Sequence, residues 1–386
     1  MLPHIHAYLA GRDLSREAFP FGLHSPGRIN IIGEHTDYTG GWVMPAAIDK
    51  GIEFYARRIE GTELKLHAVD LDQRYTLPLP VTGKTGELWV DYLAGICAEF
   101  QLLGHEVPGM EIVFGGNVPR GSGMSSSAAL EGGLAFLLND ALDAGISRPQ
   151  LALLCQRSSN NFIGVPTGIM DQFASLNGSA EGPIMLNCES LDFSPISANL
   201  PGYDWLLVNS MVTHELGSSE YPVRVRECAE AYTAVKAAFP EVPNLSATSP
   251  EQFAVVAEQL PEVVRNRGRY VVEENARVRQ MAKALKAGDV KTAGDLLNAT
   301  HAGLRDDYAV SCPEIDFLQE QATGAFSGDV AGARIMGGGF GGCTINLVRT
   351  ADIPALQEFL RSAYAAAYGQ EPDFYGVKIG AGTSNI

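Results

Sequence analysis

The glycine- and serine-rich segment Gly115–Ala129 has the residue types of an anion-binding loop. It follows an apolar stretch and opens a stretch with helical periodicity. Glycines let a backbone approach a ligand closely, and the first N–H groups of a helix attract negative charge. The hydroxyls of Ser125, Ser126 and Ser127 can donate to phosphate oxygens or bind Mg²⁺. The segment therefore indicates a phosphate site, with a serine cap on a buried helix as the alternative.

This segment departs from both common nucleotide-binding fingerprints. Gly116 and Gly121 have the spacing of a P-loop, but Ser122 occupies the position of the required lysine. A dinucleotide-binding loop needs a third glycine three residues after Gly123, and Ser126 stands there. Both of those folds are disfavoured.

A second polar cluster follows the predicted strand Arg28–Ile32. Glu34, His35 and Asp37 lie within four residues of one another in a loop that begins with glycine. Carboxylates and an imidazole this close suit a metal ion or the adjacent hydroxyls of a sugar, and a solvated turn is the alternative. Arg28 is either an exposed charge or a clamp for a phosphoryl group.

Two further segments carry candidate chemistry. Asp171 opens a predicted helix, where an aspartate serves as a cap or dipole partner as readily as a catalyst. The segment Gly337–Gly342 holds five glycines in six residues. This exceeds what a turn requires, so we expect a second close approach of backbone to a ligand.

The elements that position these residues alternate between strands and helices, and this order predicts an α+β fold. Turn residues at Pro201-Gly202 offer the best boundary, so we expect domains at residues 1–204 and 205–386. The expected strands are Arg28–Ile32, Met110–Phe114 and Trp205–Val208, and the expected helices are Ala128–Leu142 and Val272–Leu285.

Composition restricts the classes of partner and compartment. The 386 residues carry a net charge of −17, which argues against nucleic acid and anionic membranes as partners. Hydrophobic residues at 46% and charged residues at 19% are typical of a compact soluble chain. No apolar run is long enough to cross a bilayer, and the amino terminus lacks the features of a secretory signal. The six cysteines include no C-x-x-C pair, so we expect reduced thiols in the cytoplasm.

Together the motifs resemble those of the GHMP kinases, which phosphorylate small molecules. The stretch Gly27–Tyr38 is similar to the signature of the galactokinase branch, which is long and specific. Gly168–Gln172, Ser218–Tyr221 and Leu304–Asp306 also resemble galactokinase segments. The resemblance therefore covers nearly the whole chain.

The resemblance implies two α+β domains with the active site in the cleft between them. It implies transfer of the ATP γ-phosphoryl group to the C1 hydroxyl of α-D-galactose, the first phosphorylation step of galactose catabolism, with Mg²⁺ as metal and no obligate protein partner. Glu34, His35, Asp37, Gly168 and Tyr221 match sugar-binding positions, Asp171 the catalytic aspartate and Arg28 the arginine beside it. Gly121, Ser122, Gly123, Met124, Ser125, Ser126 and Ser127 match the ATP phosphate loop, with Ser127 at a magnesium-ligand position.

One position departs from the family pattern. Ser159 stands where the family usually has a glutamate that binds magnesium. Mg²⁺ needs only one or two protein ligands beside substrate phosphates, so the site can survive this loss. We expect weaker magnesium binding, with Asp171 or water filling the gap.

Two rival functions fit the same motifs. Some fungal relatives of galactokinase bind sugar and ATP but act as regulatory sensors, and these lack a Ser-Ala dipeptide in the phosphate loop. Ser127-Ala128 and Asp171 are present here, which favours an enzyme. The second rival is a kinase for another sugar, such as N-acetylgalactosamine.

Overall fold

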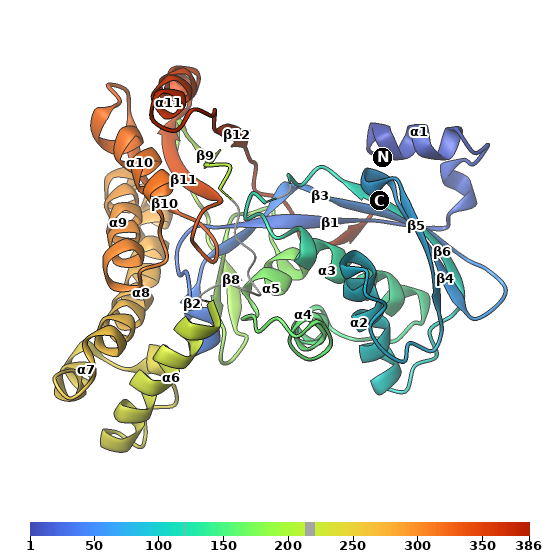
Figure 1. Ribbon diagram of the computed structural model, residues 1–386, viewed down its shortest axis with the longest axis horizontal. Helices are drawn as coiled ribbons and strands as arrows, with labels where there is room; N and C mark the ends of the chain where they lie inside the picture. The colour runs from blue at the N-terminus through green and yellow to red at the C-terminus, as the bar shows by residue number, and fades with distance from the viewer. Residues whose placement is uncertain (120, 213–220) are drawn as a thin grey trace.

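The computed structural model of the chain describes residues 1–119, 121–212 and 221–386. The elements form two halves that lie side by side, with the first half on the right and the second on the left in Figure 1. Each half has its own sheet packed against helices. The predicted α+β architecture is therefore confirmed.

The first half is built on a six-stranded sheet in the order β13-β1-β3-β6-β4-β5. Its strands pair antiparallel except for β4 and β6, which are parallel. β13 comes from the end of the chain and pairs with β1, so both termini lie near this sheet (Figure 1). The bounds are β1 Phe21–Asn30, β3 Pro45–Arg58, β4 Glu63–Ala68, β5 Gln73–Pro78, β6 Met110–Gly116 and β13 Ser384–Asn385.

Helices cover both faces of this sheet because side chains alternate along its strands. On β3, Phe54 joins the core beneath α2 to α5, whereas Tyr55 joins a small core with Ile5 and Leu9 of α1. Figure 1 shows α1 on the opposite side of the sheet from the other four helices. The bounds are α1 Pro3–Ala10, α2 Leu88–Leu102, α3 Ser126–Ala141, α4 Arg148–Arg157 and α5 Met170–Asn177.

The second half has a four-stranded antiparallel sheet in the order β10-β11-β9-β12. Along β9, Leu206 and Val208 pack with α10 and α11, whereas Trp205 and Leu207 pack with α8 and α9. The strands are β9 Tyr203–Asn209, β10 Val330–Ile335, β11 Cys343–Arg349 and β12 Asp373–Gly376. The helices are α6 Tyr221–Ala238, α7 Pro250–Ala257, α8 Glu262–Ala287, α9 Val290–Ala302, α10 Pro313–Glu320 and α11 Ile353–Tyr368.

A shared apolar core joins the two halves. Ile29, near the end of β1, and Ile31, just after it, pack in one cluster with Val278 of α8 and Ile345 of β11. A small sheet of β2 Trp42–Val43, β7 Ile184–Asn187 and β8 Phe193–Pro195 lies beside this contact. The division at residues 204 and 205 stays a prediction; β9, which begins at Tyr203, belongs to the second sheet.

Most of the predicted elements are confirmed, and two have different bounds. β6, β9 and α3 match their predictions to within a few residues. The predicted strand Arg28–Ile32 overlaps only the end of β1, although the Ile31 N–H still bonds to the Met44 carbonyl at 2.9 Å. α8 begins at Glu262 rather than Val272, because Gly268 fits tightly against Phe253 of α7, where any Cβ would lie 2.5 Å from the ring.

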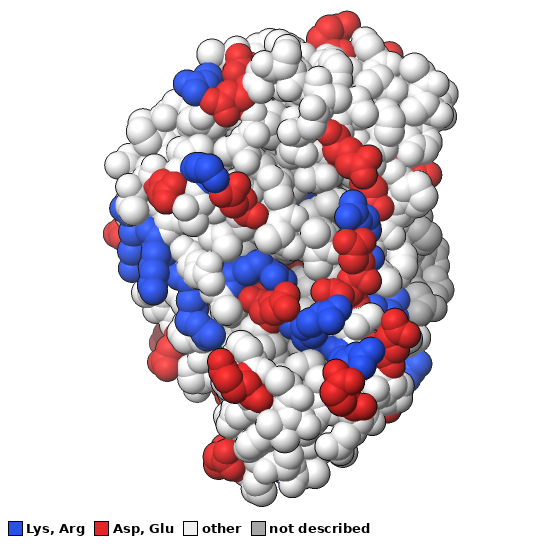
Figure 2. All heavy atoms as spheres, turned by 90° about the vertical axis from the view of Figure 1, so that its left-hand side faces the viewer, with Lys and Arg blue, Asp and Glu red and all other residues white. Residues whose placement is uncertain are grey.

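The sequence predicts reduced cysteines and no apolar run long enough to cross a bilayer. All six cysteines are free thiols, and four are buried. Among the described residues, no helix is both long and apolar enough to cross a membrane. Figure 2 views the side formed by the second half, where acidic and basic side chains are interspersed.

Candidate active site

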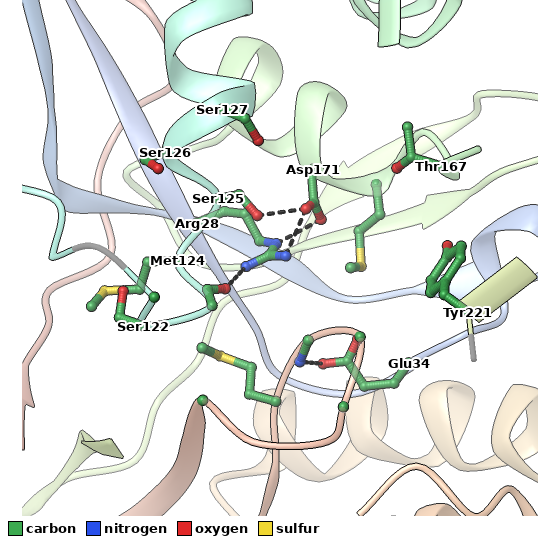
Figure 3. Close-up of a pocket in the computed structure, with 18 of the residues that line it drawn as sticks. Arg28, Glu34, Ser122, Met124, Ser125, Ser126, Ser127, Thr167, Asp171 and Tyr221 are labelled. Carbon is green, nitrogen blue, oxygen red and sulfur yellow. Dashed lines mark hydrogen bonds and ion pairs between the residues drawn. The ribbon is translucent and has the colours of Figure 1, made fainter. Parts of the chain in front are cut away.

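A cavity of about 280 Å³ lies where the two halves meet. Residues after β1, the loop into α3, the start of α5, the start of α6 and the glycine segment before β11 form its wall (Figure 3). Every predicted site residue lines this cavity except Gly168 and Ser159. Side chains that are far apart in the sequence therefore meet at one place.

The loop Gly121–Ser127 enters α3 with a strained backbone. Gly121, Gly123 and Ser125 have φ values of +67°, +70° and +55°. Glycine adopts this left-handed region freely, but a residue with a side chain pays about 1 kcal/mol. The Ser125 hydroxyl donates to Oδ2 of Asp171 at 2.5 Å, which holds the serine in this conformation. The loop is thus shaped around the cavity rather than relaxed into an ordinary helix cap.

Asp171, the second residue of α5, is held by a two-pronged ion pair. Nε and Nη2 of Arg28 donate to its two carboxylate oxygens, each at 2.7 Å (Figure 3). Nη1 of the same guanidinium donates to the Gly123 carbonyl, which ties the pair to the phosphate-loop candidate. The Arg28 side chain is 5% exposed and that of Asp171 is 26% exposed. A carboxylate fixed in this way keeps its orientation while it still faces the cavity.

The predicted sugar-binding residues form a second cluster in the same cavity. Glu34, His35 and Asp37 come from the loop after β1, and Tyr221 begins α6 with its ring centroid 5.3 Å from that of His35. Gly168 does not line the cavity but packs against Asp37. A Cβ on Gly168 would lie 1.8 Å from Asp37 Oδ2, so only glycine leaves room for that carboxylate.

Burial sets the protonation of this cluster. It lowers the pKa of His35 to about 3, so the imidazole is neutral at pH 7. Burial, helped by the negative charges of Asp171 and Glu34, raises the pKa of Asp37 to about 7. Asp37 is therefore close to half-protonated at neutral pH in the ligand-free protein.

Replacing Asp37 with asparagine is expected to raise the melting temperature of the ligand-free protein more at pH 8 than at pH 5. The folded state binds a proton that the unfolded state has already released, so the free energy of unfolding falls as the pH rises from 3.8 to about 7. An amide removes this penalty. We expect a difference of roughly 2 kcal/mol between the two pH values, or a few degrees in thermal unfolding.

The matched control for this measurement is Asp295→Asn on α9, where the aspartate side chain is 62% exposed. Its ion pair with Lys291 at 2.5 Å is exposed and contributes little at either pH, so the control should change stability about equally at both pH values. Equal stabilisation by Asp37→Asn at pH 5 and pH 8 would contradict the expected burial effect.

The two predicted magnesium positions are not equivalent. Ser127 lines the cavity at the start of α3. Ser159 is 4% exposed and lies behind the wall, where its hydroxyl donates to Glu131 at 2.7 Å. Gln172 donates to the other oxygen of Glu131 at 3.3 Å, and burial raises the pKa of Glu131 to about 8. A role for Ser159 at a metal site stays a prediction.

Sequence reasoning missed Glu131 and Arg334. Glu131 lies four residues after Ser127 on the same helix, so its helical spacing was an available signal. Arg334 is a single charged residue in the otherwise apolar end of β10, and its Nη1 donates to Glu34 at 3.0 Å. The glycine segment that follows lines the cavity through Gly337, Gly338, Gly339, Gly341 and Gly342.

Comparison with known proteins identifies the family. The galactokinase galactose-binding signature matches residues 14–58, the GHMP kinases N terminal domain residues 91–179, and the GHMP kinases C terminal model residues 281–366. A curated galactokinase of Roseiflexus sp. (strain RS-1) is 36% identical over 379 residues, which cover 96% of each chain. The chain belongs to the galactokinase family. A galactokinase of Halalkalibacterium halodurans is 37% identical and covers 93% of this chain and 91% of its own.

Solved structures agree with this membership. A Lactococcus lactis galactokinase complexed with galactose has a TM-score of 0.91 and 36% identity, and 95% of each chain is covered. A Methanococcus jannaschii mevalonate kinase has a TM-score of 0.66 at 17% identity, which speaks for the fold alone. This galactokinase-family member is a sugar kinase and uses ATP as its co-substrate.

Proposed function

We propose that this kinase transfers the γ-phosphoryl group of ATP to the C1 hydroxyl of α-D-galactose, giving galactose 1-phosphate and ADP. The observation that carries the proposal is the single cavity that unites Asp171, held by Arg28, with the sugar-binding candidates Glu34, His35 and Asp37. The galactose-bound relative at 36% identity supports the choice of sugar. The six free thiols suit a reducing compartment, and we place the reaction in the cytoplasm.

In this proposal Asp171 accepts or orients the C1 hydroxyl proton. Phosphoryl transfer depends mainly on alignment and charge neutralisation. The two hydrogen bonds from Arg28 and one from Ser125 hold the carboxylate in one orientation. The γ-phosphoryl group would lie against the loop Gly121–Ser127, where backbone N–H groups at the start of α3 attract negative charge. Asp171 and this loop are within hydrogen-bonding reach of each other, so both substrates can meet there.

The cavity wall suits Mg²⁺. This ion prefers oxygen ligands and takes most of them from water and phosphates. The Ser127 hydroxyl and the Asp171 carboxylate line the same cavity and supply such oxygens, and Ser127 is the residue we assign to the metal. When bound, Mg²⁺ would neutralise charge on the transferring phosphoryl group. Ser159 donates to buried Glu131, so we assign it a place behind the metal rather than direct contact.

Ser159→Glu is expected to lower the magnesium concentration that half-saturates activity by about 3- to 10-fold, because a carboxylate near the cavity attracts the cation. The same change sets a second carboxyl against Glu131, so the metal-free variant should also melt several degrees lower and recover when Mg²⁺ and nucleotide are added. Magnesium titration of activity and thermal unfolding measure the two effects.

Ser159→Gln is the control, because it has the size of glutamate without the charge. It should share any loss from crowding but gain no affinity for magnesium. The same half-saturating magnesium concentration in wild type and Ser159→Glu would refute the hypothesis that Ser159 weakens magnesium binding.

A coupled assay of ADP release over a panel of sugars tests the proposed function. We expect ADP with galactose at least tenfold faster than with glucose or mannose. Faster release with N-acetylgalactosamine would make the protein a kinase for that sugar. Binding of sugar and ATP, with no ADP formed from ATP in the presence of any hexose, would favour the sensor.

A further inference from the structure

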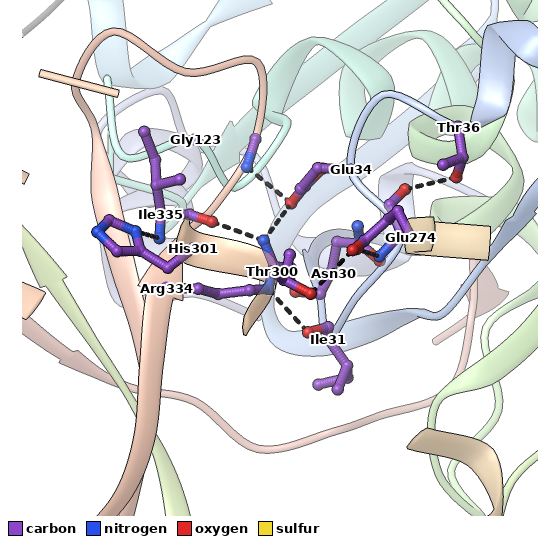
Figure 4. Close-up of polar contacts among 12 residues, drawn as sticks. Asn30, Ile31, Glu34, Thr36, Gly123, Glu274, Thr300, His301, Arg334 and Ile335 are labelled. Carbon is purple, nitrogen blue, oxygen red and sulfur yellow. Dashed lines mark hydrogen bonds and ion pairs between the residues drawn. The ribbon is translucent and has the colours of Figure 1, made fainter. Parts of the chain in front are cut away.

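Arg334 is a fully buried arginine of the second half. Its side chain reaches the loop after β1 in the first half, which carries Glu34. Arg334 lies in β10, and its side chain is 0% exposed. Nε donates to the Ile31 carbonyl at 2.9 Å, and Nη2 donates to the Asn30 carbonyl at 2.5 Å. Nη1 donates to Glu34 Oε1 at 3.0 Å and to the Ile335 carbonyl at 2.6 Å (Figure 4). The guanidinium is therefore bonded to both halves.

The charge of Arg334 is balanced by Glu34. Of the four acceptors just named, three are carbonyls, and only the Glu34 carboxylate is an anion. The surrounding core contains Ile29, Ile31 and Ile345, so an apolar side chain at position 334 would join the halves as well. Because a buried ion pair adds little stability over apolar packing, a role in position rather than in stability is the better account.

The contacts to Glu34 fall on one of its two carboxylate oxygens. Oε1 accepts from Arg334 Nη1 at 3.0 Å and from the Gly337 N–H at 2.9 Å. Oε2 is needed for neither contact, and Glu34 lines the cavity. An anchored Oε1 leaves Oε2 in a fixed direction, as recognition of one sugar hydroxyl requires.

Part of the backbone of this loop is held by residues other than Arg334. Glu274 of α8 accepts from the Gly33 N–H at 2.8 Å, and the Tyr270 hydroxyl donates to the Glu34 carbonyl at 3.1 Å. These contacts, which include Glu274 in Figure 4, do not involve Arg334, so Gly33 and Glu34 keep them without it, whereas the Asn30 and Ile31 carbonyls lose their donor. Loss of Arg334 should therefore release the carboxylate more than the loop.

We propose that Arg334 is a positioning residue that aims Glu34 at one hydroxyl of the sugar. The proposal rests on the proposed function, with galactose as the substrate. The Gly337 N–H donates to the same Glu34 oxygen, and Gly337 begins the glycine segment of the cavity wall. The orientation of the Glu34 carboxylate therefore also depends on the position of that segment.

Deoxy sugars test this inference. The wild type, Glu34→Gln, Arg334→Lys and Arg334→Gln would be assayed for kcat/KM on galactose and on its 2-, 3-, 4- and 6-deoxy analogues. The penalty for each analogue is the factor by which its kcat/KM falls below that of galactose. In the wild type, the analogue that lacks the hydroxyl bound by Glu34 should have a penalty that disappears in Glu34→Gln. In both Arg334 variants we expect the penalty for that same analogue to shrink by about tenfold, while the penalties for the other analogues stay within about twofold.

The control is Arg267→Lys, which alters another buried arginine of the second half. Arg267 is 7% exposed, pairs with Glu227 at 2.9 Å and does not line the cavity. It should lower stability without changing any deoxy penalty. A uniform rate loss on all five sugars in the Arg334 variants, or failure of both variants to fold with galactose present, would make Arg334 purely structural and overturn the inference. A wild type inactive on galactose would instead overturn the proposed function, and this inference with it.

Discussion

Asp171→Asn is expected to lower kcat by about 10²- to 10⁴-fold while galactose still binds. The amide has nearly the shape of the carboxylate, so the cavity keeps its form and the sugar-binding candidates stay in place. It cannot accept the hydroxyl proton, and it offers Arg28 one oxygen in place of the two that now accept at 2.7 Å. The loss should therefore fall on turnover rather than on sugar affinity.

Galactose binding by calorimetry and turnover by ADP release separate these two effects. Asp37→Asn is the informative comparison, because Asp37 lies among the sugar-binding candidates and should affect KM more than kcat. Turnover of Asp171→Asn within about threefold of the wild type would contradict the role assigned to Asp171. A complete loss of galactose binding would show that the carboxylate acts chiefly in substrate binding.

Arg28→Met is expected to lower kcat/KM by about 10²- to 10³-fold. This change removes the two hydrogen bonds to Asp171 and the one to the Gly123 carbonyl, so both the carboxylate and the loop Gly121–Ser127 lose their anchor. The Arg28 side chain is only 5% exposed, and its loss leaves Asp171 without its partner cation. Since Asp171 is partly solvated, we expect a stability loss of about 1 to 3 kcal/mol, below that of a fully buried pair.

Arg28→Lys distinguishes charge from geometry. Lysine keeps the positive charge but cannot donate to both carboxylate oxygens and to Gly123 in one plane. We expect an activity between those of the wild type and Arg28→Met, measured as kcat/KM at saturating ATP. Wild-type activity in Arg28→Lys would mean that the two-pronged geometry is unnecessary.

Much of this site is predictable because its chemistry is local in the sequence. The loop Gly121–Ser127, the acidic loop after β1 and Asp171 each lie in a short motif whose residue types indicate their roles. Helical periodicity identifies α3, and the short apolar runs identify β6 and β9. The family resemblance adds the expectation that these motifs share one cleft, which the cavity bears out.

What escaped prediction depends on contacts between distant segments. Nothing local at Arg334 points to Glu34, which is 300 residues away in the chain. The missing carboxylate at Ser159 is visible in the sequence, but its hydrogen bond to Glu131 depends on how α3 packs against the turn after α4. The start of α8 was missed because its charged, glycine-containing first turns are stabilised by packing against α7 rather than by their own propensity.

The most direct test of the proposed function is the chemical identity of the product. Galactose and ATP would be incubated with the enzyme and Mg²⁺, and the phosphorylated sugar examined by phosphorus-coupled proton NMR. The proposed reaction predicts one sugar phosphate, whose phosphorus couples to the anomeric proton of the α form. A phosphate coupled to the C6 protons, or ADP formed with no sugar phosphate, would contradict it.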